Sequence, residues 1–330
     1  MGIDYPIIGA PMFLVSNEDM VVEISEAGAL GTFPALNYRP LASYVKALKE
    51  IKSRTKKPVG VNIIVNKSNS RQHEDLKHAL DAGVELFVTS LGSPKEVIYE
   101  AHKNGAKVIC DVTNLEHAMK VQDLGADGVV AVASGAGGHA GPISTLVLIP
   151  WLKKHLKIPI IAAGGIADGR TLAAAIALGA SAAHVGTRFI ASKEATVQQN
   201  YKSAIVNSSP EDIVMSTRVS GTPCAVINTK DVQQMGLDLP WAVRVLKEHP
   251  KTKKFVVPLI HALGMKALEG AATKSRWKEV WSAGQSVGLI DEIKTCREIV
   301  RDMVAEYRQV LGSMPKEVES SAPRIRTSPS

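Results

Sequence analysis

The chain has 330 residues and a formal net charge of +7, and 45% of its residues are hydrophobic. This length suits one large α/β barrel with an insertion, or two domains. Aromatic residues make up only 5%, which argues against a surface that stacks nucleic-acid bases. The three cysteines, Cys110, Cys224 and Cys296, are far apart and form no CxxC pair, so we expect neither a disulfide framework nor a zinc site. No apolar run approaches the length of a membrane span, and the N-terminus lacks the basic start of a signal peptide. We therefore expect a cytoplasmic protein without a membrane or nucleic-acid partner.

Short apolar runs and amphipathic segments alternate over the first half of the chain. We expect strands at 5–10, 29–34, 58–65, 85–90, 106–111, 127–132, 159–165 and 182–187. We expect helices between them at 17–28, 41–54, 71–83, 94–105, 114–125, 144–156 and 168–179. The strands are nearly continuous apolar runs, as in a parallel sheet covered by helices. Eight strand–helix units at this spacing predict an α/β fold, a (β/α)8 TIM barrel, rather than an open doubly wound sheet.

The predicted helices carry local signals for where they begin and end. Glycines suited to a left-handed C-cap follow five of them, at Gly28, Gly83, Gly105, Gly125 and Gly179. Predicted N-caps are Asn17, Asn114, Ser144 and Asp168. Pro150 lies inside the sixth helix, where its missing N–H predicts a kink or a break.

The pattern changes after the eighth strand. A short helix is expected at 193–206, an irregular and mainly helical segment at 207–288, and a long amphipathic helix at 289–311. We interpret 1–206 plus 289–311 as the barrel, with the last helix closing it. The segment 207–288 is expected to be a smaller helical lid domain over the barrel mouth. Residues 312–330 have little apolar periodicity and are predicted to be a disordered tail.

In a TIM barrel the active site lies at the C-terminal ends of the strands. The segments AAGGIADG (162–169) and HVGTRFIAS (184–192) place Gly164, Gly165, Gly186 and Thr187 at the ends of the last two strands. Exposed backbone N–H groups there can bind an anion, and this is the recurrent phosphate-binding place of the fold. Tight turns that serve packing alone are the alternative.

Other strand ends carry candidate ligand contacts. At the first strand, Ala10, Pro11 and Met12 could pass under a flat ring, although core packing explains them as well. Asn62 ends the third strand and can donate and accept toward a heterocycle, or simply cap the strand. Asp111 ends the fifth strand; it could orient a histidine, contact a cofactor or be an exposed loop carboxylate.

The stretch SGAGGHAG (134–141) follows the sixth strand and places His139 among glycines. Glycines mark places where something approaches the main chain closely, so we expect His139 to contact a ligand or to act in catalysis, with Gly138 beside the cofactor. An imidazole is a suitable base at neutral pH. No second histidine or carboxylate lies at ligand spacing, so no metal is expected.

The segments GAPMF, FPALN, GVNIIV, SGAGGHAG, IAAGGIADG and HVGTRFIAS follow one another at successive strand ends. Together they resemble the nitronate monooxygenase family, formerly called 2-nitropropane dioxygenases. The related FMN-dependent enoyl-ACP reductases share much of the pattern. The resemblance runs from about residue 3 to about residue 311, and AGQSVGLI (283–290) looks like the family's closing signature.

The resemblance implies a TIM barrel that binds FMN without a covalent bond, under a small helical domain. It implies that Ala10, Pro11 and Met12 lie against the isoalloxazine and that Asn62 contacts its polar edge. It implies that the glycines of the last two strands, with Thr187, hold the phosphate. Gln285 would reach the flavin from the lid, and His139 matches the histidine that deprotonates neutral nitroalkanes.

The chain also departs from the family pattern. Many members have Glu–Ala–Gly–Gly–His, whereas Gly135 occupies the glutamate position here. Some relatives carry a lysine after the fifth strand, where this chain has Asp111. These departures leave the substrate open.

Three functions follow from the sequence. The leading hypothesis is an FMN-dependent monooxygenase that uses O₂ to oxidise alkyl nitronates to a carbonyl compound and nitrite. The second is an FMN-dependent reductase of enoyl thioesters or quinones that takes electrons from NAD(P)H. The third is a barrel that binds a phosphorylated metabolite without redox chemistry. The partners expected are a small-molecule substrate and, in a homo-oligomer, a second copy of the chain.

Overall fold

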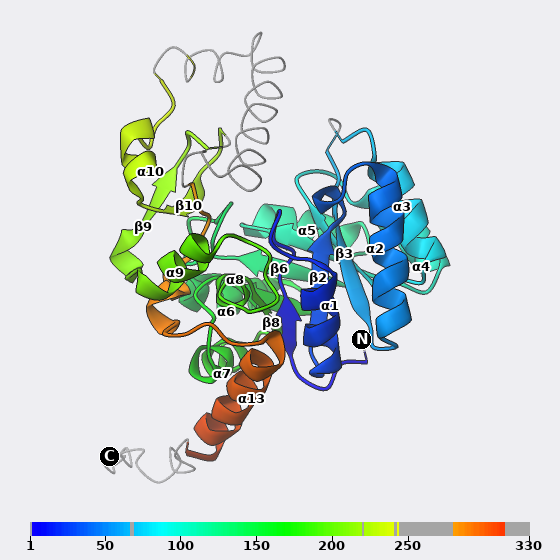
Figure 1. The fold of residues 1–330 in the computed structure, drawn as a ribbon. Coiled ribbons are helices and arrows are strands. Elements are labelled where there is room, and N and C mark those ends of the chain that lie inside the picture. Colours follow the sequence, from blue (N-terminus) through cyan, green and yellow to red (C-terminus); the bar gives the residue numbers. More distant parts are fainter. Residues whose placement is uncertain (1, 67–68, 220, 241–242, 244–279, 314–330) are drawn as a thin grey trace, which may run out of the picture.

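The computed structural model describes residues 2–66, 69–219, 221–240, 243 and 280–313. Its centre is a closed barrel of parallel strands in the order β1 to β8, with β8 paired back to β1 (Figure 1). The strands are β1 (Ile7–Gly9), β2 (Leu30–Pro34), β3 (Val59–Ile64), β4 (Leu86–Ser90), β5 (Lys107–Val112), β6 (Gly128–Val132), β7 (Ile160–Ala163) and β8 (Ala182–Val185). All eight predicted strands are present, so the TIM barrel prediction is confirmed.

The helices that cover the barrel also lie where they were expected. They are α1 (Glu18–Glu26), α2 (Leu41–Arg54), α3 (Gln72–Asp81), α4 (Lys95–Lys103), α5 (Leu115–Asp123), α6 (Thr145–His155) and α7 (Gly169–Ala177), with the 3₁₀ turn η1 (Ala35–Asn37) after β2. Asn17, Asn114 and Asp168 each accept a backbone N–H as N-caps. The five predicted C-cap glycines all have positive φ.

Two local predictions hold only in part. Ser144 is the N-cap residue of α6, but its side chain makes no capping hydrogen bond. Pro150 lies inside α6 without breaking it. The carbonyl that Pro150 leaves without an N–H partner belongs to Leu146, which is 69% exposed, so water can reach that carbonyl.

The chain after β8 differs more from expectation. Its described elements are α8 (Thr187–Ile190), α9 (Gln199–Asn207), η2 (Pro210–Asp212), β9 (Ile213–Ser216), β10 (Cys224–Ile227), α10 (Lys230–Met235), η3 (Gln285–Leu289) and α13 (Cys296–Ser313). The helix predicted at 193–206 begins only at Gln199. The antiparallel pair β9–β10 was not predicted, because four-residue apolar runs show no decisive periodicity. Residues 244–279, the centre of the predicted lid domain, lie outside the described residues, so the domain boundaries stay predictions.

The last helix closes the layer around the barrel. It starts at Cys296, seven positions later than predicted, because Thr295 and Glu298 form a reciprocal cap: each backbone N–H donates to the other residue's side chain. α13 packs against α7 and α1, which confirms it as the barrel's last helix. It continues to Ser313, two residues into the predicted tail; 314–330 lie outside the described residues.

Two apolar layers hold the barrel together. One lies between the strands and the helices. The other fills the inside of the barrel with Ile8, Leu30, Leu86, Val88, Ile109, Val130, Ile161, Ala163 and Ala182. This inner core stops short of the C-terminal rim. In the last inward layer before that rim the side chains are small or polar: Ala10, Asn62, Asp111 and Ala163. We call this C-terminal end the mouth of the barrel.

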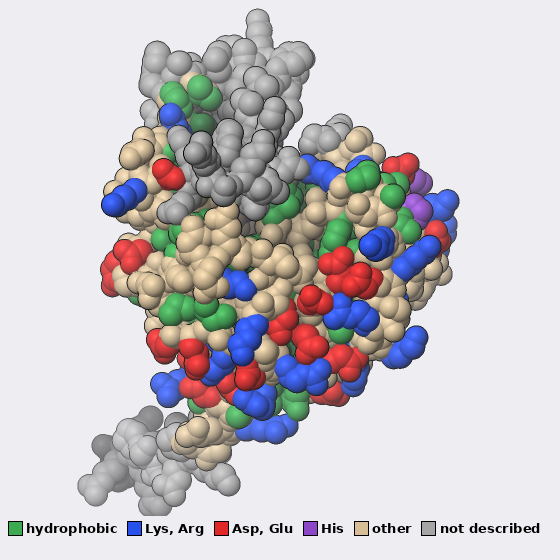
Figure 2. All heavy atoms as spheres, in the orientation of Figure 1, with side chains coloured by type: hydrophobic (Ala, Val, Ile, Leu, Met, Phe, Trp, Pro, Cys, Tyr) green, Lys and Arg blue, Asp and Glu red, His purple; other side chains and the backbone are tan. Residues whose placement is uncertain are grey.

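Charged side chains of both signs lie on the surface of the described residues. On the face shown in Figure 2, positive and negative side chains are interspersed over the lower half of the molecule. Oppositely charged side chains also form ion pairs, such as Arg54–Asp19 and Arg297–Glu23. Within the described part of the chain, no helix is both long and apolar enough to cross a membrane.

Candidate active site

The ends of β7 and β8 present backbone N–H groups toward the mouth. Among the described residues, the amides of Gly164, Gly186 and Thr187 donate to no protein group. Gly165 differs: its N–H donates to the Gly135 carbonyl at 3.2 Å. Gly165 also has positive φ (77°) and open space where a side chain would stand. Three of the four predicted phosphate contacts therefore offer a donor, and Gly165 offers room.

The carbonyl of Gly135 connects three segments. It accepts the N–H of Gly165 and the N–H of Gln285, both at 3.2 Å. A Cβ at Gly284 would lie 2.4 Å from the same oxygen, so only glycine allows this crossing. The exposed Gln285 is thus held beside the β7 glycines, although it is distant in sequence.

The glycines around His139 are explained by close packing of backbones. Gly138 and Ala225 of β10 exchange two backbone hydrogen bonds, at 3.1 and 2.7 Å. Gly137 lies against the backbone of Gly284. The residue before the exposed His139 is therefore fixed by the β9–β10 pair. That role of the pair was not visible in the sequence.

The loop after β1 lies beside the β8 glycine. An added Cβ at Gly186 would contact Ala10 at 3.5 Å and the sulfur of Met12 at 3.8 Å. The Asn37 side chain holds this loop: it donates to the carbonyls of Met12 and Ser16 and accepts from the amide of Leu14. Asn37 stands at a predicted strand end, but its structural role depends on contacts that sequence spacing does not show.

A chain of hydrogen bonds crosses the ends of β3, β4 and β5. The Asn62 amide donates to the Val88 carbonyl at 3.1 Å and to the Ser90 hydroxyl at 2.8 Å. Ser90 in turn donates to Oδ2 of Asp111 at 2.6 Å. Both amide hydrogens of Asn62 are therefore used inside the barrel. With both hydrogens used, Asn62 offers its carbonyl oxygen toward a ligand, and its contact with a ring stays a prediction.

Asp111 carries an oxygen that nothing in the described chain satisfies. Its Oδ1 is buried without a hydrogen-bond partner. Burial raises the pKa of Asp111 to about 6, against the lowering effect of the Ser90 hydrogen bond. A buried acceptor without a partner is costly, and it marks a place where a ligand can bind.

His184 lies close to the candidate site and was not singled out from the sequence. It is 9% exposed, and its Nε2 is buried without a partner. The strand pairing places its side chain inside the barrel, one layer below Ala10, Asn62, Asp111 and Ala163. Burial lowers the pKa of His184 to about 4, so the ring is neutral at pH 7. A histidine in the middle of a buried strand was the available signal.

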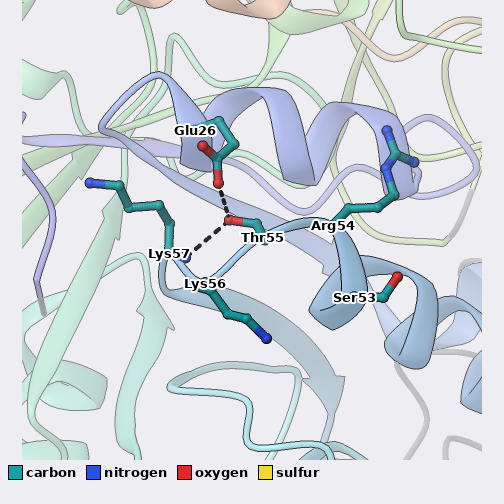
Figure 3. Close-up of a pocket in the computed structure, with 6 residues that line it drawn as sticks. All are labelled: Glu26, Ser53, Arg54, Thr55, Lys56 and Lys57. Carbon is teal, nitrogen blue, oxygen red and sulfur yellow. Dashed lines mark hydrogen bonds between the residues drawn. The ribbon is translucent and has the colours of Figure 1, made fainter.

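A pocket at the other end of the barrel has no such unmet groups. It is lined by Glu26 and by 53–57, at the C-terminal ends of α1 and α2 (Figure 3). The Thr55 hydroxyl donates to Glu26 and accepts the backbone N–H of Lys57. Arg54 pairs with Asp19 and Lys57 with Asp4. These groups satisfy one another, and we assign no chemistry to this pocket.

The mouth fits a flat heterocycle that carries a phosphate. The unbonded amides near β7 and β8 suit the phosphate. The Asn62 carbonyl and the unpaired Asp111 oxygen suit the polar edge of a ring, and the Ala10–Met12 loop supplies an apolar side. In the described residues, no group of three His, Cys, Asp or Glu side chains could hold a metal ion. The fold defines a TIM-barrel protein, and groups without a hydrogen-bond partner lie at or near the C-terminal ends of its strands.

The family follows from comparison with known proteins. The model of the nitronate monooxygenase family matches residues 1–81 and 70–306. The chain belongs to this family of flavin-dependent oxidoreductases, as the sequence motifs indicate.

Individual relatives differ in their named activities. The chain is 30% identical to (3aS,4S,5R,7aS)-5-hydroxy-7a-methyl-1-oxo-octahydro-1H-indene-4-carboxyl-CoA dehydrogenase of Rhodococcus jostii, over 93% of each chain. It is 27% identical to a probable nitronate monooxygenase of Staphylococcus saprophyticus, over 94% of this chain and 97% of that one. The structure of FabK from Thermotoga maritima superimposes with a TM-score of 0.81 at 33% identity, covering 94% of both chains.

Proposed function

We propose that the protein is an FMN-dependent oxidoreductase that acts on a carbon acid, with His139 as the residue that moves the proton. The observation that carries this proposal is the division of the mouth into three parts. Unbonded amides lie at β7 and β8, an unsatisfied polar chain lies at β3 to β5, and the His139 loop follows β6. Bound FMN would supply the ring that takes up or gives back the electron pair.

The chain's own residues have distinct tasks in this proposal. The amides of Gly164, Gly186 and Thr187 hold the phosphate, and the Asn62 carbonyl and Asp111 orient the ring. His139 takes a proton from carbon during oxidation, or returns one during reduction. The two backbone hydrogen bonds between Gly138 and Ala225 hold the loop that carries His139.

The substrate class favoured is an acyl thioester. A carbon next to a thioester carbonyl is acidic enough for a positioned base, and the Rhodococcus jostii relative is named as a dehydrogenase of a carboxyl-CoA. Many family members carry a glutamate at position 135, whereas this chain has glycine and so offers no carboxylate there. NAD(P)H is the proposed second electron partner.

Oxidation of alkyl nitronates by O₂ is the second candidate. The matching family model and the Staphylococcus saprophyticus relative favour it. A nitronate is already deprotonated, so it would need His139 less than a nitroalkane does.

An anaerobic absorbance titration of the FMN-loaded protein separates the candidates. Parallel samples receive a short acyl-CoA, an enoyl-CoA with NADH or NADPH, and an alkyl nitronate. Bleaching by acyl-CoA or by the nucleotides, with reoxidation by enoyl-CoA, supports the thioester reaction. Bleaching by the nitronate alone moves the assignment to nitronate oxidation. No response to any of them overturns the proposal of carbon-acid oxidation.

A further inference from the structure

Asp111 lies where a bound ring would cover it. It shares one layer of the barrel interior with Asn62, Ala10 and Ala163. The residue is partly exposed, whereas its Oδ1 is buried and has no hydrogen-bond partner. A ring in the mouth would remove the remaining water from this carboxyl group.

No positive charge in the described interior compensates an ionised Asp111. His184 is the titratable side chain in the layer below, and burial keeps its ring neutral at pH 7. Cys110 precedes Asp111 on β5 and is buried, and burial raises the pKa of its thiol to about 11. β4 offers the Ser90 hydroxyl, and β6 offers Val130 and Val132, so neither supplies a charge. His139 stands on the loop after β6, but burial and the Ser90 hydrogen bond, rather than this ring, set the pKa of Asp111.

A ligand ring with carbonyl oxygens at its edge needs hydrogen-bond donors. Asn62 has none left, because both of its amide hydrogens stay inside the barrel. Ser90 has also used its only hydrogen, on Oδ2 of Asp111. On this side of the mouth, the donor that the described polar chain can still provide is a proton on the carboxyl group of Asp111.

We propose that Asp111 takes up a proton from solvent when FMN binds and, as a neutral acid, donates a hydrogen bond to a carbonyl at the polar edge of the ring. This inference rests on the proposed FMN cofactor. In this proposal Asp111 contacts the cofactor and carries a proton, at a position where some relatives have a lysine. Cofactor affinity would then depend on pH through one residue.

The test is FMN binding to the apo protein, followed by quenching of flavin fluorescence. The pH is varied from about one unit below to about two units above the pKa of Asp111. Riboflavin is titrated in parallel, because the FMN phosphate has its own pKa near 6. The variants are Asp111→Asn, Ser90→Ala and, as a matched control at the other end of the barrel, Asp127→Asn. Calorimetry in two buffers of different ionisation enthalpy counts the protons taken up.

The expected result is a Kd that rises about tenfold per pH unit above the pKa of Asp111, for both ligands. Asp111→Asn should bind riboflavin with a nearly pH-independent Kd and no proton uptake. Ser90→Ala, which removes the hydrogen bond that favours the ionised form, should shift the rise to higher pH. Asp127→Asn should keep the wild-type slope. A flat wild-type Kd, or an equal slope in Asp111→Asn, overturns the proton uptake and leaves the FMN assignment standing. Absence of FMN and riboflavin binding at every pH overturns both.

Discussion

Two aspartates at opposite ends of the barrel differ in their hydrogen-bond partners and in the direction of their pKa shifts. At the N-terminal end, Asp127 accepts hydrogen bonds from the Val108 amide, Lys107 and His102. Burial alone would raise the pKa of Asp127, but these partners together lower it. At the C-terminal end, Asp111 has one partner and an orphaned oxygen, and burial raises its pKa to about 6.

The same contrast holds for neighbouring groups. Glu85 at the N-terminal end binds Lys52 and the amide of Val59, whereas His184 near the mouth has a buried nitrogen without a partner. Groups that satisfy one another stabilise the fold. Groups left unsatisfied cost stability and stay available to a ligand, as expected of a functional site.

The largest expected effect is on turnover at the mouth. His139→Gln should lower turnover of a substrate that must lose or gain a proton at carbon by about 10²–10⁴-fold, with FMN affinity nearly unchanged. Steady-state kinetics and an FMN titration measure the two. The matched control is His73→Gln, whose side chain is 79% exposed on α3. Equal turnover in both variants would remove His139 from the mechanism.

A smaller effect is expected on the pH dependence of the free energy of unfolding, through His184. Its pKa is about 4 in the folded protein, against an ordinary histidine value of 6.5, so below pH 6.5 the unfolded chain binds a proton that the folded chain refuses. The free energy of unfolding should fall as pH drops from 6.5 to 4, by up to about 3 kcal/mol from this group. Denaturant melts of wild type and His184→Gln at several pH values isolate the contribution of His184. Parallel curves for the two proteins would contradict the buried neutral ring.

A substitution at Gly284, where its backbone crosses that of Gly135, should lower the free energy of unfolding by nearly as much. Gly284→Ala places a Cβ 2.4 Å from the Gly135 oxygen, which should cost about 1–3 kcal/mol of stability and weaken FMN binding by displacing Gln285. Gly312→Ala, with nothing within 4 Å of the new Cβ, is the control and should be neutral or slightly stabilising. Thermal melts and FMN titrations of the two variants test this. An equal Tm for both would show that the segments of Gly135 and Gly284 can move apart without loss of stability.

The two aspartates should respond in opposite directions at pH 7. Asp127→Asn loses charge-assisted hydrogen bonds and should destabilise by about 1–2 kcal/mol. Asp111→Asn removes a buried charge and should stabilise by about 1–2 kcal/mol, less than the roughly 3 kcal/mol that the pKa shift allows, because the bond from Ser90 weakens. Urea unfolding measures both, and a loss of stability in both variants would erase the contrast between the two ends.

The sequence predicted the parts of the structure that depend on local pattern. Apolar runs and glycine caps gave the strands and helices, and strand ends gave the ring of candidate residues. The sequence TCRE at Thr295–Glu298 matches the capping-box pattern. It could have predicted from the sequence alone that α13 starts at Cys296. The β9–β10 pair, the Ser90–Asp111 bond and the orphaned nitrogen of His184 depend on contacts between distant segments. No periodicity reports such contacts.

The central claim is that the mouth at β7 and β8 holds the phosphate of FMN, and Gly165 offers the most direct test. It has positive φ and open space around a new side chain, a conformation that Asp and Asn both tolerate. FMN titrations of Gly165→Asp and Gly165→Asn compare a negative charge with a neutral group of the same shape. The account predicts one FMN per wild-type chain and a Kd raised about 100-fold in Gly165→Asp, with a much smaller rise in Gly165→Asn. Equal Kd values in the two variants, or a wild-type chain that binds no FMN, would contradict it.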